Sequence, residues 1–232
     1  KKISRREDKI PKGVPIVILW KHVKGEKKRI GLFSEFPKLW RFIIKYVTPK
    51  IKKIVGKKGH KIQLLETIIF NKPYEISNFV QWHQDASTWP LKPHDRQVAA
   101  WIPFDKVDEE AGALQYALGS HKIGIRAATD LHTSKKNSKK DKKIPVSSNP
   151  KKEGFKVKTM NMESIDMLCH HGYVWHFSKP NSKLKKGRIG LTIRYILKQV
   201  KYQPIPGQAA AFIKQIDVKK GQIIKGPAFP KI

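Results

Sequence analysis

Two side chains near the middle of the chain could bind the same metal ion. His83 and Asp85 flank Gln84 in the segment Val80-Gln81-Trp82-His83-Gln84-Asp85. On a β-strand, side chains two positions apart point to the same side, so the imidazole and the carboxylate would converge. A second, distant histidine would complete a two-histidine, one-carboxylate face, which holds Fe(II) and leaves positions open. Because a single His-x-Asp motif also arises by chance, the rest of the chain must support this hypothesis.

The elements expected to position these side chains are mostly β-strands. Between residues 188 and 196, large apolar side chains occupy every second position, which is the period of a strand. Other short runs rich in β-branched and aromatic residues are bounded by Gly, Pro, Asn and Asp. Many short strands after a helical start predict a mainly β domain with flanking helices, an antiparallel sandwich or jelly roll. The predicted strands are residues 61–70, 98–104, 114–118, 165–170, 173–177 and 188–196.

The beginning of the chain is predicted to be basic and partly helical. Residues 14–20 form a short apolar run that we expect to be a strand. A helix is expected to begin near Ser34, with Pro37 in its first turn, because apolar residues then recur at helical spacing. Pro49 is expected to break or kink this helix, and Gly56 is expected to end it.

The whole chain, residues 1–232, is predicted to form a single domain. Residues 133–156 contain Lys, Ser, Asn and Pro but almost no apolar side chains, so we expect a mobile surface loop between strands. Because the chain begins at Lys1 rather than Met, we expect its natural N-terminus to be missing. The expected parts are an N-terminal segment 1–60, a jelly-roll core 61–200 and a C-terminal extension 201–232.

The composition is strongly basic. The 232 residues include 49 Lys and Arg but 18 Asp and Glu, a formal net charge of +31. Such an excess suggests nucleic acid or an anionic surface as a partner. However, only 8 of the basic residues are Arg, which is preferred for specific contacts with bases and phosphates. Residues 63–134, which include His83 and Asp85, contain 6 basic and 9 acidic residues, a net charge of −3. We therefore expect a lysine-rich solvated surface rather than a nucleic-acid site.

Several classes of protein do not fit the sequence. Cys169 is the only cysteine, which excludes a disulfide framework and any zinc site with several cysteines. No apolar run reaches the ~20 residues of a membrane span, and no signal-peptide pattern is present. A cytoplasmic protein without a membrane span is therefore expected.

An ordered series of motifs surrounds His83 and Asp85. The series resembles the phytanoyl-CoA dioxygenase family of Fe(II)- and 2-oxoglutarate-dependent oxygenases over roughly residues 61–200. The resemblance implies a double-stranded β-helix, a cupin-like jelly roll, with iron in its mouth. The motifs are Trp89-Pro90, Val98-Ala99-Ala100-Trp101-Ile102-Pro103, Asp108-Glu109-Glu110-Ala111-Gly112-Ala113-Leu114, Gly119-Ser120-His121-Lys122, His170-His171-Gly172-Tyr173-Val174-Trp175-His176-Phe177-Ser178, Pro180-Asn181-Ser182 and Arg188-Ile189-Gly190-Leu191-Thr192-Ile193-Arg194-Tyr195.

The resemblance implies roles for two groups of residues. One group would bind iron and the other would surround the co-substrate, so that the implied cofactors are Fe(II), 2-oxoglutarate and O₂. In the second group, a serine and an arginine bind the far carboxylate of 2-oxoglutarate. An aromatic residue lies beside the co-substrate, and a lysine lies near the site. The metal group is His83, Asp85 and His176, and the 2-oxoglutarate group is Ser178, Arg188, Trp89 and Lys72.

The carboxylate-binding arginine has two candidates. Arg188 lies twelve residues after His176, whereas the family's arginine usually lies eleven residues after the distal histidine. A one-residue insertion near residues 185–187 accounts for this departure. Arg194 is the weaker candidate, on the same face of the predicted strand. Either guanidinium would suit a carboxylate, because it can donate two parallel hydrogen bonds.

The remaining histidines are expected to have structural roles. His170 and His171 flank a predicted turn, where they would support the site from behind or line its pocket. His121 is expected to pack or to form a hydrogen bond at a strand end. The adjacent His94 and Asp95 would point to opposite sides of a strand, so they do not form a ligand pair.

Asp85 favours hydroxylation as the reaction. Halogenases of the resembled family have a small residue in place of this carboxylate. We therefore expect a hydroxylase of a small-molecule substrate that releases succinate and CO₂. Lysines near the mouth favour an anionic substrate such as a carboxylate, a phosphonate or an acyl-CoA, and the oligomeric state is open. Two alternatives remain: a nucleic-acid-modifying dioxygenase that uses the basic flanks, and a non-catalytic binding member of the fold.

Overall fold

Most of the chain is described by a computed structural model. The described residues are 36–56, 62–72, 79–127, 149–183, 186–197, 199–204, 216–226 and 228–232, with the backbone of 16–18.

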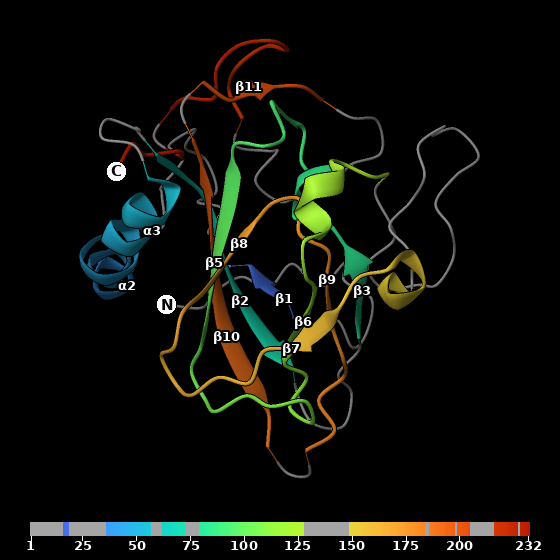
Figure 1. Ribbon diagram of the computed structural model, residues 1–232. Helices are drawn as coiled ribbons and strands as arrows, with labels where there is room; N and C mark the ends of the chain where they lie inside the picture. Colours follow the sequence, from blue (N-terminus) through green and yellow to red (C-terminus); the bar gives the residue numbers. More distant parts are fainter. Residues whose placement is uncertain are drawn as a thin grey trace, which may run out of the picture.

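Two antiparallel sheets form the body of the protein (Figure 1). The larger sheet has five strands, in the order β1-β2-β10-β5-β8. The smaller sheet has four strands, in the order β3-β9-β6-β7, and a two-stranded sheet pairs β11 with β4. The bounds are β1 Ile16–Ile18, β2 Gln63–Lys72, β3 Val80–His83, β4 Leu91–Lys92, β5 Gln97–Pro103, β6 Leu114–Ala117, β7 Val157–Thr159, β8 Leu168–His171, β9 His176–Ser178, β10 Arg188–Ile196 and β11 Lys201–Tyr202.

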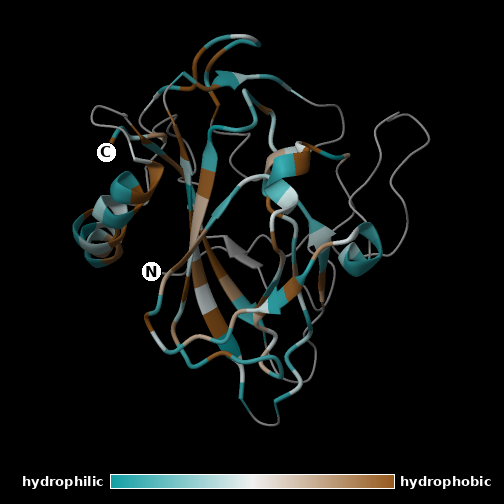
Figure 2. Ribbon diagram, in the orientation of Figure 1, coloured by the Kyte–Doolittle hydropathy of each residue, from teal (hydrophilic) through white to brown (hydrophobic). Residues whose placement is uncertain are grey.

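The larger sheet is apolar on its outer face, which the helices cover. Ile43, Val47 and Ile51 pack in one core cluster with Leu191 and Ile193 of β10. Figure 1 shows the helices lying along one side of this sheet, and Figure 2 shows hydrophobic residues concentrated along its strands. The helical segments are α2 Pro37–Phe42, the π-helical turn η1 Ile43–Val47 and α3 Thr48–Val55.

The inner face of the same sheet carries polar side chains. Alternation along β10 places Arg188 and Arg194 on the face opposite the helix-packed Leu191 and Ile193. In β2 a register shift changes this alternation: Arg194 pairs with Glu66, but Tyr195 pairs with Leu64. The extra residue, Leu65, is a bulge of the kind that re-aims neighbouring side chains. As a result, Glu66 lies against Arg194 in the interior.

The predicted fold class is confirmed, and most of the predicted elements are found with shifted ends. The strand predicted at 188–196 has the same bounds in the structure, while the strand predicted at 165–170 begins only at Leu168. Of the predicted loop 133–156, residues 149–156 are described, and they contain a 3-10 helix, η4 Pro150–Glu153. The remainder of that loop and Ser34 lie outside the described residues.

Pro49 was expected to break or kink the helix, and the expectation of a break was wrong. The backbone stays helical to Val55. The helix ends, as expected, at Gly56, which has a left-handed φ of 69°. Pro49 lies in the first turn of α3, immediately after the π-helical turn. A proline is tolerated in a first helical turn because its missing N–H is not needed there. Within the described residues, no helix is both long and apolar enough to cross a membrane.

Candidate active site

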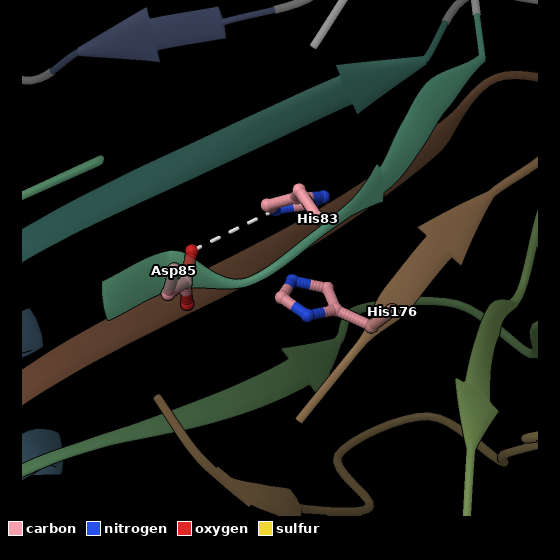
Figure 3. Close-up of side chains that lie close together, drawn as sticks. All are labelled: His83, Asp85 and His176. Atoms are coloured by element: carbon pink, nitrogen blue, oxygen red, sulfur yellow. Dashed lines mark ion pairs between the residues drawn. The ribbon is translucent and has the colours of Figure 1, made fainter. Parts of the chain in front are cut away.

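Three side chains predicted to bind a metal come together between β3 and β9. His83 ends β3, His176 begins β9, and the two residues are paired directly across these strands. Asp85 begins the 3-10 helix η2 Asp85–Thr88 and points to the same place (Figure 3). One potential ligand atom from each residue lies within 4.8 Å of the other two, and the side chains are buried. The backbone at Gln84 is extended, with φ −113° and ψ 130°, so the two side chains of the His-x-Asp motif converge as expected although Asp85 itself lies in η2.

Both histidines have their ring orientation fixed by the backbone. His83 Nδ1 lies 2.7 Å from the carbonyl oxygen of Gln81, and His176 Nδ1 lies 3.0 Å from that of Val174. A carbonyl can only accept, so each Nδ1 carries the hydrogen in these contacts. In a neutral ring this leaves Nε2 with a free lone pair, which is the state a metal ligand requires. Two such nitrogens with one carboxylate form the donor set preferred by non-heme Fe(II).

The carboxylate of Asp85 is held on both oxygens. Arg194 Nη2 donates to Oδ1 at 3.0 Å, and His170 Nε2 lies 3.3 Å from Oδ2. Arg194 Nη1 also donates to Glu66 Oε2 at 2.8 Å, so one guanidinium joins two buried carboxylates. On the other side, the Tyr116 hydroxyl lies 2.8 Å from His170 Nδ1. Asp85 thus lies at the centre of a buried polar network that restricts its orientation.

The pKa values follow from this network. Burial alone would raise the pKa of Asp85, but Arg194 and the hydrogen bonds from His170 and His83 outweigh burial and hold it well below its usual range. Burial raises the pKa of Glu66, although Arg194 opposes this. Burial, together with the neighbouring histidines, keeps the pKa of His176 well below its usual value. The site therefore presents an ionised carboxylate and a neutral imidazole at neutral pH.

A second cluster of predicted residues lies two positions further along β9. Lys72 at the end of β2 is paired directly with Arg188 at the start of β10. Lys72 Nζ donates to Ser178 Oγ at 2.7 Å, and Arg188 Nη2 donates to the Gly112 carbonyl at 3.0 Å. Ser178 Oγ donates to the same carbonyl at 2.8 Å. Lys72, Ser178 and Arg188 are 1%, 2% and 3% exposed, so two basic side chains are buried side by side.

No carboxylate among the described residues pairs with these two basic side chains. Lys72 contacts a hydroxyl and backbone carbonyls, and Arg188 Nε is buried without a partner. The Arg188 guanidinium lies 4.8 Å from the centre of the Trp101 ring. Burial and the charge of Arg188 lower the pKa of Lys72 to about 6, and burial lowers that of Arg188 to about 10. Unbalanced positive charge of this kind fits a ligand that carries a carboxylate.

A glycine at a close approach makes this cluster possible. Gly112 has a left-handed φ of 74°, and a Cβ there would come within 2.5 Å of the carbonyl oxygen of Lys179. The turn containing Gly112 can therefore lie directly against the end of β9. This contact brings its carbonyl to the point where Ser178 and Arg188 both donate hydrogen bonds.

The remaining two candidates for binding the co-substrate, Arg194 and Trp89, lie on the side of the metal site. The Arg194 guanidinium carbon is 5.0 Å from the centre of the Trp89 ring, which is 2% exposed. Trp89 packs in a cluster with Leu65 and Leu91. Because Arg194 is bound to Asp85 and Glu66, its guanidinium is already occupied by carboxylates. The geometry favours Arg188 over Arg194 as the arginine available to a further anion.

Sequence reasoning missed two members of the network and placed a third only loosely. Glu66 and Tyr116 were not singled out, and His170 was expected only to support the site or line it. In the structure His170 contacts Asp85 directly. A signal for Glu66 was present, because a single acidic residue within the apolar run Leu64-Leu65-Glu66-Thr67-Ile68 requires a buried partner. Nothing in the local sequence of Tyr116 distinguishes it from an ordinary core tyrosine.

Known proteins share both sequence and fold with this chain. The family model for phytanoyl-CoA dioxygenase (PhyH) matches residues 18–188. The peroxisomal phytanoyl-CoA dioxygenase of Bos taurus is 29% identical over 107 residues, which are 44% of this chain and 31% of that protein. The match therefore spans less than one third of the length of this relative.

Solved structures extend the likeness in fold. The carbocyclase SnoK from nogalamycin biosynthesis, described as α-ketoglutarate-dependent, is 18% identical with a TM-score of 0.67, covering 86% of this chain and 73% of that one. The epimerase SnoN, in complex with Fe³⁺ and α-ketoglutarate, is 17% identical with a TM-score of 0.64, covering 85% and 75%. EvdO2 from Micromonospora carbonacea var. aurantiaca is 16% identical with a TM-score of 0.57, covering 84% and 72%. The double-stranded β-helix is thus confirmed as the fold. With the family model matching most of its length, this chain belongs to the phytanoyl-CoA dioxygenase (PhyH) family of Fe(II)- and 2-oxoglutarate-dependent oxygenases.

Proposed function

We propose that this protein hydroxylates a small molecule, with Fe(II) held by His83, Asp85 and His176. The observation that carries the proposal is the state of the two imidazoles: both Nδ1 hydrogens are committed to backbone carbonyls, and both Nε2 atoms are left to converge with a carboxylate. The far carboxylate of 2-oxoglutarate is assigned to Arg188, Ser178 and Lys72. In support, the positive charge of this cluster has no carboxylate partner in the described part of the chain. Trp89 would lie beside the bound co-substrate.

The chain would contribute orientation, charge and exclusion of water. When bound, Fe(II) and 2-oxoglutarate supply the oxidising chemistry: O₂ is activated as 2-oxoglutarate is converted to succinate and CO₂. Arg194 and His170 hold Asp85 ionised and restrict its rotation. Arg188 and Lys72 provide charge-assisted hydrogen bonds for the far carboxylate. The burial of Asp85, His170, Arg188 and Lys72 keeps bulk water from the place where a reactive oxidant would be quenched.

Loss of one histidine tests the assignment of the metal ligands. We expect His176→Ala to lower succinate release by well over ~100-fold, since loss of groups behind a ligand alone costs ~10–100-fold. His121→Ala is the matched control, because His121 is exposed and lies in the 3-10 helix η3 Ser120–Ile123. The measurement is succinate formed from 2-oxoglutarate with Fe(II), O₂ and a panel of metabolites. Full activity in His176→Ala would contradict the proposal.

The substrate is proposed to be an anion such as a carboxylate, a phosphonate or an acyl-CoA. Support comes from the net charge of +31 and from lysines in segments that border such sites in this fold. Hydroxylation, rather than halogenation, is favoured by the carboxylate of Asp85. A succinate-release screen should therefore favour anionic metabolites over their neutral analogues. Equal turnover of both kinds would remove the charge argument and leave the assignment of the metal site intact.

A further inference from the structure

Gln84, the middle residue of the metal motif, has a buried amide with specific partners. His83 and Asp85 point into the metal site, so the intervening side chain points the opposite way. Gln84 is 0% exposed. A fully buried amide is costly unless its donors and its acceptor are all satisfied.

The amide of Gln84 joins two segments that lie far away in the sequence. Nε2 donates to the carbonyl oxygens of Gly124 and Tyr173, both at 2.8 Å. Oε1 accepts from the backbone N–H of Arg126 at 2.7 Å. Both hydrogens of the NH₂ group and the carbonyl are therefore used. A side chain of similar length without an amide could not reproduce this set of contacts.

The first partner segment contains Tyr173 and leads directly into the distal histidine. The turn between β8 and β9 holds Tyr173, three residues before His176. A second contact ties the same turn to the metal motif, because the N–H of Ala86 donates to the Gly172 carbonyl at 3.0 Å. The position of this turn sets where β9 begins. Gln84 thus connects the element that supplies His83 and Asp85 to the element that supplies His176.

The second partner segment follows η3 and is linked onward to η4. The Arg126 guanidinium lies 5.7 Å from the centre of the Trp175 ring and donates to Glu153 at 3.4 Å. Ser120, at the start of η3, accepts a hydrogen bond from the N–H of Trp175 at 2.9 Å. Residues 120–127 therefore contact both the turn before His176 and, through Arg126, residues 150–153.

We propose that Gln84 is a positioning residue that fixes the turn before His176, and the segment 124–126, against the His83–Asp85 motif. It touches neither the metal position nor the co-substrate cluster. Its effect is to set the separation of the ligands supplied by two different elements. This inference goes beyond the proposed function, and its structural part does not depend on that function being correct.

Hydrogen exchange in the metal-free protein tests the proposal without any turnover. Gln84→Met keeps the length of the side chain but removes all three hydrogen bonds. We expect about tenfold faster amide exchange in peptides spanning 120–127 and 172–176, and unchanged exchange in β10. Gln115→Met is the matched control, because the Gln115 amide donates to Thr159 on the neighbouring strand at 3.3 Å. Wild-type exchange of both segments in Gln84→Met would overturn the proposal.

A second variant separates the hydrogen bond that the Gln84 amide accepts from the two that it donates. It also tests the proposal if Gln84→Met does not fold. Gln84→Glu keeps an oxygen that can accept from the Arg126 N–H, but it places an oxygen opposite the carbonyls of Gly124 and Tyr173. We expect faster exchange in 172–176 with retained protection of the Arg126 amide. A change confined to the Arg126 amide, or equal loosening throughout the molecule, would contradict a positioning role.

The same variants should alter metal binding without altering the co-substrate cluster. We expect Gln84→Met to weaken Fe(II) binding ~10–100-fold, the range found when a group that orients a ligand is lost. At saturating Fe(II), KM for 2-oxoglutarate should stay within about twofold of wild type. Unchanged Fe(II) affinity would overturn the link to the ligands. If wild-type protein bound Fe(II) but released no succinate, the proposed function would fail while the exchange and affinity results still decided the role of Gln84.

Discussion

The two buried clusters at either end of β9 differ in how their charges are balanced. Around His176, the Arg194 guanidinium lies between the carboxylates of Asp85 and Glu66. Around Ser178, Lys72 and Arg188 are buried side by side, and the described residues offer them only hydroxyl and carbonyl oxygens. The first cluster has an excess of negative charge and the second an excess of positive charge.

This difference indicates what each cluster is suited to bind. A buried carboxylate pair around one guanidinium is left with net negative charge, which a divalent cation would neutralise. Two basic side chains buried without a counter-ion lose favourable hydration, and this lowers the pKa of Lys72 to about 6. An incoming carboxylate would stabilise both of them in their charged forms. A molecule that chelates a metal at one end and carries a carboxylate at the other would satisfy both clusters at once.

The largest expected effect comes from removing the arginine of the cluster around His176. In metal-free protein, Arg194→Met leaves the carboxylates of Asp85 and Glu66 buried without the guanidinium that they share. We expect the free energy of unfolding to fall by ~3–5 kcal/mol, the usual cost of breaking a buried ion pair. Urea denaturation in the presence of a chelator measures it.

The matched substitution in the cluster around Ser178 should behave differently. Arg188 lies on the same strand as the partly buried Arg194 and is fully buried, but Arg188→Met removes a cation that has no carboxylate partner among the described residues. The Gly112 carbonyl keeps its hydrogen bond from Ser178. We expect the metal-free protein to be at least as stable as wild type. If both variants lost the same stability, the contrast between the clusters would be wrong.

Arg188→Met should instead show its effect when 2-oxoglutarate binds. We expect its Kd for 2-oxoglutarate to rise ~100-fold, because a buried charge-assisted contact with a carboxylate is lost. Arg188→Lys should recover only part of the affinity, since an ammonium cannot donate two parallel hydrogen bonds. Calorimetric titration with the metal present measures both values. An unchanged Kd in Arg188→Met would assign the far carboxylate to another group.

The sequence predicted which candidate side chains lie together better than it predicted what surrounds them. His83, Asp85, Ser178 and Arg188 lie in short motifs whose spacing and strand period are local properties. Their partners come from distant strands and depend on register. Glu66 reaches Arg194 only because of the bulge at Leu65, and a bulge on one strand has no clear local signature.

The fold was predictable for a similar reason. Alternation in β10 and turn residues between short strands were sufficient for an antiparallel sandwich or jelly roll, because each is written in a few adjacent residues. The family resemblance then favoured the double-stranded β-helix. The continuity of the helix through Pro49 was not predictable in this way. It depends on the π-helical turn at Ile43–Val47, whose Ile43 and Val47 pack against the sheet.

Proton uptake at Lys72 is the smallest effect and the most specific test of the cluster around Ser178. In the ligand-free protein the pKa of Lys72 is about 6, against an ordinary value of 10.5, so its amine is mostly neutral at pH 7.5. A bound carboxylate favours the ammonium form and raises this pKa again. Binding of 2-oxoglutarate should therefore take up about one proton between pH 7 and 9. Uptake should fall to about half a proton near pH 6 and vanish about one to two pH units lower, where the amine is already protonated.

Calorimetry in buffers of different ionisation enthalpy measures this uptake, and Lys72→Met should abolish it. Lys92→Met, at an exposed lysine of β4, is the control that should leave it unchanged.

The lowered pKa of Lys72 also makes the stability of the ligand-free protein depend on pH. Between pH 6 and 10 the unfolded chain binds a proton at Lys72 that the ligand-free native state has released, so stability should rise with pH in wild type relative to Lys72→Met. Equal pH dependence in the two proteins would mean that Lys72 stays charged without its anion. The positive charge of the cluster would then already be balanced in the ligand-free protein.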